Sequence, residues 1–367
     1  MDVVSDAIAA VRVGRPDSNR MRVTGSWCTR FAPYDGAGFH VVLRGTCWLL
    51  PDGEGAPVSL GTGDAVLLPH GTGHVLADAP ADAATVERAV PFERWQAEGG
   101  PGPTPAPGPT PGPGSTPGPG STPGPGSGAG AATGREGGDG AELLCGKYRL
   151  DRSLTHPLMA ELPVVVHLPH RVGDHPELRA AIDLLGREHH GPLPGSSIAV
   201  PGLLDLLLVY MLRSWLAGNA TAARPVPGSG PAAGYATGAG SRAGAAGGSG
   251  SWPAALNDPV VAAALRALHD APAAPWTVNR LAAEAGVSRA TLARRFTSLV
   301  GRSPMAYLGW WRLTLAARTL RETSVPLEAV ARQVGYGSPY ALSHAFLRLF
   351  GTTPGRYRAT RHGPRPT

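Results

Sequence analysis

The sequence predicts an α+β chain, in which a small β-barrel or sandwich closed by two helices precedes an all-α domain of two tandem helix-turn-helix units. Three observations predict this fold class. Short alternating apolar runs with glycine turns fill much of the first half, capped helical segments fill the last third, and two low-complexity stretches divide the chain. We therefore expect a first domain over 1–217 with an insert at 99–140, a linker over 218–251, and a helical domain over 252–363.

The segments that we interpret as strands lie on both sides of the insert. They are "GFHVVLRGTCWLL", "VSLGTGDAVLLPHGTGHVLAD" and "AELLCGKYRLD", which combine apolar alternation with turn-forming glycines. The strand at Cys145 is expected to follow residues 75–78 in the barrel, so the insert joins strands that lie close. The barrel tolerates such a loop because closure entropy grows only logarithmically with loop length.

Two helices, over 176–190 and 197–217, are expected to close the first domain. The stretch "VPGLLDLLLVYMLRSWLA" (200–217) is the most apolar of the chain, but it contains Asp205 and Arg213 and is barely long enough to cross a bilayer. We interpret it as a buried helix. Its apolar face either packs on the barrel or meets a second copy of the chain.

The insert and the linker both lack the composition of a packed core. Residues 99–140 repeat proline and glycine, as in "PGPTPAPGPTPGPGSTPGPG", and residues 218–251 are rich in Gly, Ala and Ser. Neither offers enough apolar side chains to offset the entropy of ordering. We expect both stretches to lie outside the packed domains.

Charge is unevenly distributed along the chain. The whole chain has 33 Lys+Arg and 27 Asp+Glu, a net charge of +6. Residues 256–367 hold 15 Arg and 5 acidic residues, so this third carries +10 and the remainder −4. A basic third predicts a polyanion partner. Codon bias would explain why arginine replaces lysine, but it would not remove the acidic residues.

The N-terminal segment and the cysteines indicate the compartment. "MDVVSDAIAAVRVG" has acidic residues where a signal peptide needs positive charge. Cys28, Cys47 and Cys145 have no paired or zinc-like spacing, so we expect a reduced, cytoplasmic protein with no membrane partner. A thiol-based oxidant sensor is the alternative role for these cysteines.

The last third carries the clearest local signals. Ser or Thr precedes each expected helix, and proline often follows at the first helical position, at Thr277, Ser288, Ser303-Pro304, Ser338-Pro339 and Thr353-Pro354. "TVNRLAAEAGVSRATLARRFTSLVG" and "VPLEAVARQVGYGSPYALSHAFLRLFG" each predict a helix, a tight turn and a second helix. The second helices begin 50 residues apart, at Ser288 and Ser338.

Residues 256–360 resemble the DNA-binding domain of AraC/XylS-type transcription regulators. The resemblance is carried by Leu281-Ala282, Ala285-Gly286-Val287-Ser288, Leu292, Arg294, Phe296, Gly301, Ser303-Pro304, Tyr307, Arg312, Ala316, Ala331, Val334-Gly335-Tyr336, Ser338, Phe346, Phe350-Gly351, Pro354 and Tyr357-Arg358. It implies that a long helix over 304–322 joins two units that enter successive major grooves of double-stranded DNA. The alternative is a helical protein-interaction domain whose arginines form a solvated face.

The expected reading residues lie on the outward faces of the two second helices, if Leu342, Phe346 and Leu349 face inward. The base-reading set is Arg289, Ala290, Ala293, Arg294, Thr297, Pro339, Tyr340, Ser343 and His344. Arginine can bond both major-groove acceptors of guanine, whereas Ser and His donate singly. The set assigned to phosphates is Arg295, Arg348, Arg280, Arg302, Arg312, Arg356 and Arg358. His344 and Leu347 stand where the family commonly has Arg and Lys.

The segment "GTGDAVLLPHGTGHVL" resembles the second motif of cupins, with Gly63-Asp64, Pro69, Gly71 and His74 in register. Residues 20–217 as a whole are similar to the cupin-type sensor domain of some AraC-type regulators. The resemblance implies dimerisation through the two helices at 176–217 and an effector pocket that we place at His40, Trp48, His70 and His74. We predict no cofactor, since the first motif offers only His40, and Arg44 and Gly45 follow where further ligands would stand. A metal held by His40, His70 and His74 is the alternative.

Two functions follow from these observations. The first is a ligand-responsive transcription regulator, with double-stranded DNA, an unknown small-molecule effector, RNA polymerase and a second copy of the chain as its expected partners. The family resemblance implies activation. The alternative is a metal-dependent cupin enzyme fused to a DNA-binding domain. The missing first-motif ligands and the lack of a nucleophile–base pair in the sequence favour the regulator.

Overall fold

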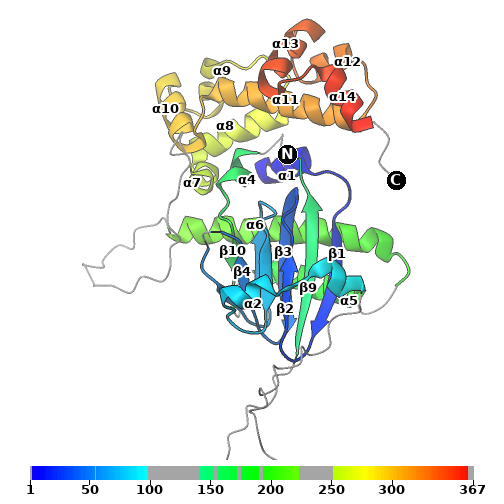
Figure 1. Cartoon of the computed structure of the whole chain (residues 1–367). Coiled ribbons are helices and arrows are strands. Elements are labelled where there is room, and N and C mark those ends of the chain that lie inside the picture. The colour runs from blue at the N-terminus through cyan, green and yellow to red at the C-terminus, as the bar shows by residue number, and fades with distance from the viewer. Residues whose placement is uncertain are drawn as a thin grey trace, which may run out of the picture.

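The computed structural model describes residues 2–53, 55–97, 140–151, 156–171, 175–189, 193–222 and 251–362 of the chain. The expected insert, apart from its last residue, and residues 223–250 of the expected linker lie outside this described part. Figure 1 shows a sheet-rich N-terminal half beneath a layer of helices formed by the last third of the chain. This is the α+β layout that the sequence predicts.

The strands of the described residues form two five-stranded sheets. In chain order the strands are β1 (Asp17–Val23), β2 (Cys28–Phe31), β3 (Gly36–Arg44), β4 (Cys47–Pro51), β5 (Val58–Leu60), β6 (Ala65–Leu68), β7 (His74–Ala77), β8 (Val90–Pro91), β9 (Ala141–Arg149) and β10 (Val166–Leu168). The first sheet has the order β1-β9-β3-β6-β10, and the second has the order β5-β4-β7-β2-β8. Neighbouring strands are antiparallel except β2 and β8, which are parallel.

The first sheet is buried on both faces. On the inner face, Val42 packs in a core that includes Leu49 of the second sheet. On the outer face, Phe39, Leu67 and Leu144 pack in a core with two long helices. Because side chains alternate between the faces of a strand, burial of both faces explains why β6 is apolar throughout and why β3 and β9 contain the unbroken apolar runs 41–43 and 143–145.

The two helices on the outer face are α5 (Pro176–Glu188) and α6 (Ser196–Ala222), close to the predicted ranges. Residues 196–219 of α6 are long and apolar enough to cross a bilayer, a test of length and composition that core helices also pass. One face of α6, with Leu204, Leu208 and Met211, is buried in the outer core. The opposite side exposes Ile198, at 81% of its surface, and Leu206.

The helices of the last third surround α11, the longest of them. They are α7 (Trp252–Asn257), α8 (Pro259–Asp270), α9 (Val278–Glu284), α10 (Arg289–Val300), α11 (Pro304–Glu322), α12 (Leu327–Gln333), α13 (Pro339–Phe350) and α14 (Pro354–His362). Tight turns join α9 to α10 and α12 to α13, with Gly286 and Gly335 at φ of 68° and 83°. This left-handed backbone conformation favours glycine. At Gly335 a Cβ would also lie 2.7 Å from the Cα of Ala273.

Short helices that the sequence analysis did not predict complete the fold. They are α1 (Val3–Val11), α2 (Ala83–Glu87), α3 (Phe92–Ala97) and α4 (Pro157–Glu161). Helix α1 lies between the sheet-rich half and the helical layer (Figure 1). Its Val3 and Ala7 join the core of α7, α8 and α10, its Ile8 joins the outer core of the first sheet, and its Val11 joins the core of α11 to α13. Helix α1 therefore connects three hydrophobic cores.

Two details differ from the expectations. The strand that contains Cys145, β9, pairs with β1 and β3 in the first sheet, whereas β7 lies in the second sheet. Leu349, expected to face inward, is 43% exposed. The physical reason lies next to it, where Phe350 packs against Phe346 and against Tyr357 of α14, so these rings fill the inner side of α13.

Candidate functional site

The first candidate surface consists of the exposed faces of α10 and α13. Each helix begins at a serine whose hydroxyl accepts a backbone N–H, Ser288 from Thr291 at 3.2 Å and Ser338 from Ala341 at 3.1 Å. These caps set the start of each helix and therefore the direction of its outward face. Neither helix contains an acidic residue.

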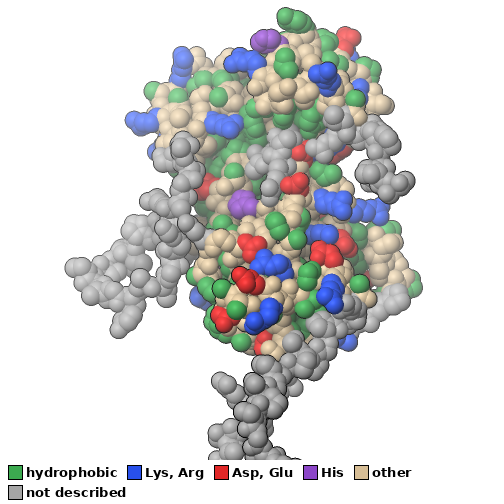
Figure 2. Space-filling model, viewed as in Figure 1, with side chains coloured by type: hydrophobic (Ala, Val, Ile, Leu, Met, Phe, Trp, Pro, Cys, Tyr) green, Lys and Arg blue, Asp and Glu red, His purple; other side chains and the backbone are tan. Residues whose placement is uncertain are grey.

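The structure leaves most of the residues expected on α10 and α13 to contact bases or phosphates accessible. The exposed ones are Arg289, Ala290, Arg294, Arg295, Thr297, Tyr340, His344 and Arg348. The half-buried ones are Ala293, Pro339 and Ser343. Tyr340 is 81% exposed, and Leu347 next to this face is also exposed. Figure 2 shows that Lys and Arg outnumber acidic side chains on the visible face of the helical layer, whereas the two signs are mixed on the sheet-rich half.

Two arginines that we assigned to phosphates bond to the backbone of the helical layer instead. Arg312 donates to the carbonyls of Pro272 at 2.7 Å and Ala274 at 2.8 Å, and its burial lowers the pKa of its guanidinium. Arg358 donates to the carbonyl of Val325 at 2.5 Å. These guanidinium groups stabilise loops, because they satisfy carbonyls that no helix pairs. The prediction that Arg312 and Arg358 contact phosphates is therefore wrong.

Three other arginines of the phosphate set have partners at the surface. Arg295 lies 3.4 Å from a carboxylate oxygen of Asp258, while Arg280 and Arg302 lie over the rings of Trp276 and Trp310. Ion pairs and cation–π contacts at exposed sites are worth about 1 kcal/mol or less. Such contacts leave these side chains free to rearrange toward a phosphate.

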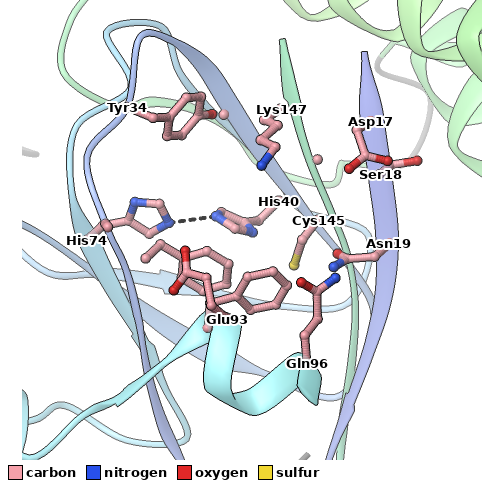
Figure 3. A pocket seen from close by; sticks show the side chains of 15 residues that line it. Asp17, Ser18, Asn19, Tyr34, His40, His74, Glu93, Gln96, Cys145 and Lys147 are labelled. Carbon is pink, nitrogen blue, oxygen red and sulfur yellow. Dashed lines mark hydrogen bonds between the residues drawn. The ribbon is translucent and has the colours of Figure 1, made fainter. Parts of the chain in front are cut away.

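The second candidate site is a cavity of about 110 Å³ between the two sheets, beside α3 (Figure 3). Its floor includes the buried or half-buried side chains of Phe31, His40, His74, Phe92 and Cys145. Its mouth carries the exposed side chains of Asp17, Glu93, Gln96 and Lys147. The site thus combines an apolar and imidazole floor with a polar entrance, a combination typical of small-molecule pockets.

The two histidines of the floor come from opposite sheets. His40 stands on β3 and His74 on β7, and their Nε2 atoms lie 2.7 Å apart. Burial lowers the pKa of His74 to about 4, and burial followed by the charge of His74 keeps the pKa of His40 well below its usual range. Both rings are therefore neutral at pH 7.

An aromatic stack forms one wall beside the histidines. Phe31 lies parallel to His74, with ring centroids 4.9 Å apart, and it stacks on Phe92 of α3 at 4.6 Å. The edge of His40 meets the same Phe31 ring at 4.9 Å. The wall is flat and rigid, because each ring is fixed by a neighbour on another element.

The structure does not bring all four expected pocket residues together. His70 bonds through Nε2 to the carbonyl of Leu162 at 2.8 Å and lines a different cavity, because the chain turns at Gly71 between it and His74. Trp48 does not belong to the lining of the histidine cavity. Within the described ranges, no group of three or more His, Cys, Asp or Glu side chains could hold a metal ion.

The cysteine nearest the histidines is buried. Burial raises the pKa of Cys145, and it raises that of neighbouring Cys47 to about 12. A thiol is reactive only when ionised, so neither side chain has the character of an oxidant sensor. The sequence analysis missed Lys147, although it stands two residues after Cys145 and therefore on the same face of β9.

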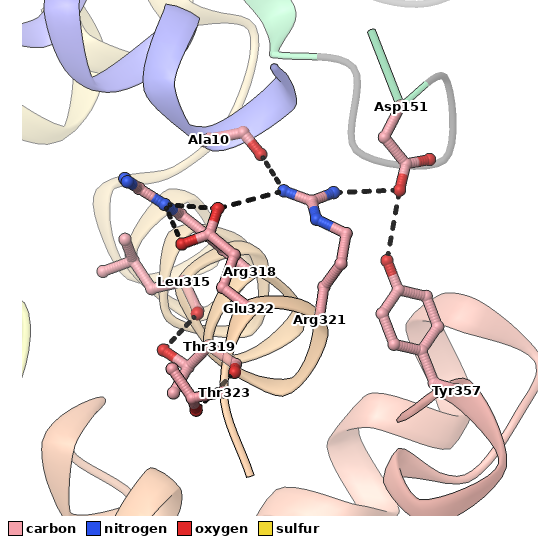
Figure 4. A network of polar contacts seen from close by, with 9 residues as sticks. All are labelled: Ala10, Asp151, Leu315, Arg318, Thr319, Arg321, Glu322, Thr323 and Tyr357. Atoms are coloured by element: carbon pink, nitrogen blue, oxygen red, sulfur yellow. Dashed lines mark hydrogen bonds and ion pairs between the residues drawn. The ribbon is translucent and has the colours of Figure 1, made fainter. Parts of the chain in front are cut away.

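Polar contacts join the two halves of the molecule around Arg321 of α11 (Figure 4). Its guanidinium donates to the carboxylate of Asp151 at 3.0 Å and to the carbonyl of Ala10 at 3.3 Å. Tyr357 donates to the same carboxylate at 3.3 Å. Asp151 follows β9 directly, so this buried ion pair links the first sheet and α1 to the helical layer.

A second chain of polar contacts crosses the same interface through Tyr307 of α11. Its hydroxyl lies 2.8 Å from Nε2 of His269 and 3.2 Å from Nε2 of His156. His269 donates from Nδ1 to the carboxylate of Asp6 on α1 at 2.9 Å, and Nδ1 of His156 accepts the backbone N–H of Leu158. Sheet-rich half and helical layer are therefore connected by buried hydrogen bonds as well as by α1.

Comparisons with known proteins agree with this architecture. Residues 2–217 match the family described as Cupin, and residues 281–360 match the family described as Helix-turn-helix domain. A Streptomyces lividans protein described as an AraC-like transcription regulator is 33% identical, over 98% of both chains. The HTH-type transcriptional regulator MtrA of Neisseria gonorrhoeae is 27% identical, also over 98% of both chains.

Several solved structures match the helical part of the chain. One of them is the DNA-binding domain of AdpA, a global transcriptional factor, in complex with a target DNA. The two chains are 36% identical, the match covers 30% of this chain and 98% of that one, and the TM-score is 0.28.

Proposed function

The chain belongs to the AraC-like transcription regulators with a cupin N-terminal region, and from this premise we propose how it reads DNA and what controls it. It is a DNA-binding transcription regulator. We infer that two tandem helix-turn-helix units, α9–α10 and α12–α13, each place their second helix in a major groove. The observation that carries the proposal is the pair of exposed, serine-capped helices without acidic residues, α10 and α13, which begin 50 residues apart.

Helix α11 supports the arrangement of the two units. Its 19 residues span about 28 Å at roughly 1.5 Å per residue. This length is close to one turn of B-DNA, roughly 34 Å, which separates successive major grooves on one side of the duplex. Its buried side chains contact both units, so it acts as a rigid spacer.

The base-reading residues of α10 and α13 are proposed from exposure and chemistry. Arg294 and His344 occupy equivalent places, six residues after Ser288 and Ser338. The guanidinium of Arg294 can bond two acceptors of one guanine, and its neighbours on that face, Ala290 and Ala293, are small enough to let it enter the groove. His344 donates singly and stands beside the bulkier Tyr340, so it reads less strictly. Arg295 and Arg348 contact phosphates, which position the helices without specifying sequence.

The sheet-rich half is proposed to sense a small molecule in the cavity lined by His40 and His74. We further propose a cytoplasmic homodimer in which α5 and α6 meet their copies, because the apolar side chains Ile198 and Leu206 of α6 are exposed. Two helical layers carried by one dimer would engage two half-sites together. RNA polymerase is the partner expected of an activator of this family.

A binding-site selection followed by affinity measurements tests the proposal. Arg294→Ala should weaken binding to the selected site by about 5- to 150-fold, since one bidentate contact contributes about 1–3 kcal/mol, and it should relax one base position. His344→Ala should cost less, and His344→Arg should raise affinity for many sequences by adding a positive charge. The matched control is Arg318→Ala, which removes the same charge from α11 next to α1, where Arg318 pairs with Glu322. A control variant that loses as much affinity as Arg294→Ala would contradict the assignment, as would lost base preference in His344→Ala alone.

A metal-dependent cupin enzyme is not proposed. The relatives that match over nearly the full chain are named as transcription regulators. The histidine pair of the cavity has no third side chain of the His, Cys, Asp or Glu type in ligand geometry within the described ranges. A stoichiometric metal in the purified protein would reopen this alternative.

A further inference from the structure

The histidine pair leaves one buried nitrogen without a partner. His40 is only 3% exposed, and among the described residues its Nδ1 has no hydrogen-bond partner. Figure 3 shows that this nitrogen points away from His74, toward the side of the cavity that Cys145 lines. A buried polar atom without a partner destabilises the fold, so a cavity beside it suggests a ligand that supplies the missing bond.

The contacts of the pair determine whether that nitrogen accepts or donates. The carbonyl of Thr72 can only accept, so His74 carries a proton on Nδ1, 2.9 Å away. A neutral His74 then has a bare Nε2, and the 2.7 Å contact requires His40 to donate from its own Nε2. A neutral His40 has no second proton. Its free Nδ1 is therefore a hydrogen-bond acceptor, and it demands a ligand that donates.

The cavity also limits the size and shape of the ligand. Its volume is about 110 Å³ with an open mouth, whereas a closed apolar cavity of roughly 150 Å³ takes up benzene. Part of the lining is aromatic, from the stacked rings of Phe31 and Phe92, and an aromatic lining favours a flat ring. A single ring that extends slightly into the mouth fits these dimensions.

The charges around the cavity indicate a neutral ligand. At the mouth, the acidic Asp17 and Glu93 face the basic Lys147, and Asp17 and Lys147 are direct partners in the pairing of β1 and β9. A carboxylate would bring negative charge and lone pairs toward a bare acceptor on His40. An alcohol or phenol group would instead donate to it and accept from Lys147 or from the amide of Gln96.

We propose that the effector is a small, neutral hydroxyarene, a single-ring phenol whose hydroxyl donates to Nδ1 of His40 and whose ring contacts the aromatic part of the lining formed by Phe31 and Phe92. This proposal rests on the proposed function, because it takes the cavity to be the sensory site. The ligand would complete a continuous line of hydrogen bonds from its own hydroxyl through His40 and His74 to Thr72. That line joins the first sheet to the second, so the ligand stabilises contact between the two sheets.

Calorimetric titration of the full chain at pH 7 with phenol, anisole and benzoate tests the proposal. Anisole keeps the ring and the oxygen but has no O–H, and it is the more apolar compound, so without the hydrogen bond it should bind at least as tightly as phenol. We expect phenol to bind roughly tenfold tighter than anisole, the factor for one net hydrogen bond, and benzoate to bind more weakly than phenol. Equal binding of phenol and anisole, or preference for benzoate, would overturn the proposal without any variant.

Two variants locate the site. His40→Phe keeps a ring of similar size without the acceptor and should bring phenol to the affinity of anisole. His70→Phe is the matched control, since His70 lines a different cavity, and it should leave phenol binding unchanged. Discrimination that persists in His40→Phe would place the ligand elsewhere. DNA binding measured on the same samples separates the proposed ligand from the proposed function. If the unmodified protein binds the selected DNA but not phenol, only the ligand class is wrong. If the unmodified protein does not bind DNA, the proposed function is refuted.

Discussion

The hydrogen-bonded chain through Tyr307 predicts a large cost for removing one hydroxyl group. His156 accepts the N–H of Leu158 at Nδ1, and burial lowers the pKa of His156, so its ring is neutral and its Nε2 donates to the Tyr307 hydroxyl. The hydroxyl in turn donates to Nε2 of His269, which donates from Nδ1 to Asp6. Each polar atom in this series of hydrogen bonds, from His156 through Tyr307 and His269 to Asp6, thus has a partner.

Tyr307→Phe leaves two buried imidazole nitrogens without partners, one on His156 and one on His269. An unsatisfied buried polar group costs about 1–3 kcal/mol, so the free energy of unfolding should fall by about 3 kcal/mol. Urea unfolding of the full chain, followed by tryptophan fluorescence, measures this change because Trp252 and Trp310 lie close to the chain of bonds. The matched control is Tyr340→Phe, the same chemical change at an exposed position of α13, which should stay within about 0.5 kcal/mol of the unmodified chain. If Tyr307→Phe is as stable as this control, the halves are not joined through a closed chain of hydrogen bonds.

Two further predictions concern pH and assembly. The pKa of His74 is 6.5 in the unfolded protein and about 4 in the folded protein, so between these pH values the unfolded state binds an additional proton and stability falls as the pH drops. We expect this residue alone to lower the free energy of unfolding by about 2 kcal/mol between pH 6.5 and pH 5. His40 and His156, whose pKa values are also lowered by burial, act in the same direction. Urea unfolding at the two pH values checks this, and a constant stability would show that the buried histidines titrate normally. For assembly, Ile198→Asp on α6 should convert a dimer to a monomer in light scattering, whereas Val164→Asp, at an exposed apolar position outside α6, should leave the mass unchanged. Equal effects of the two substitutions would exclude α6 as the dimer contact.

The helical layer could be predicted in detail because its signals are local. A capping Ser or Thr hydroxyl accepts the backbone N–H of a residue that is close in sequence, three positions further along the chain. The starts of α9, α10 and α13 therefore follow from Thr277, Ser288 and Ser338 themselves. Helix α11 covers the predicted range 304–322, although Ser303 makes no capping bond through its side chain. Proline at the first helical position and apolar spacing were enough to define that helix.

The short helices could not be predicted in the same way, because their stability comes from distant parts of the chain. Helix α1 has nine residues, too few for a stable isolated helix, and its Val3, Ile8 and Val11 each enter a different core. Distant parts of the chain also decide what Arg312 does. The sequence could not show whether its guanidinium bonds to the backbone or remains available for a phosphate. Both roles suit an arginine in a basic region, and only the position of the carbonyls of Pro272 and Ala274 distinguishes them.

The cavity shows which features of a binding site can be predicted from the sequence and which cannot. His40, His70 and His74 were all visible as candidates, and the cupin-like motif placed two of them four residues apart. What the motif lacks is the direction of each hydrogen bond. The carbonyl of Thr72 fixes the proton of His74, the approach of the two sheets fixes that of His40, and the turn at Gly71 takes His70 to the other side. The acceptor at Nδ1 of His40, on which the ligand class depends, therefore arises only when the two sheets meet.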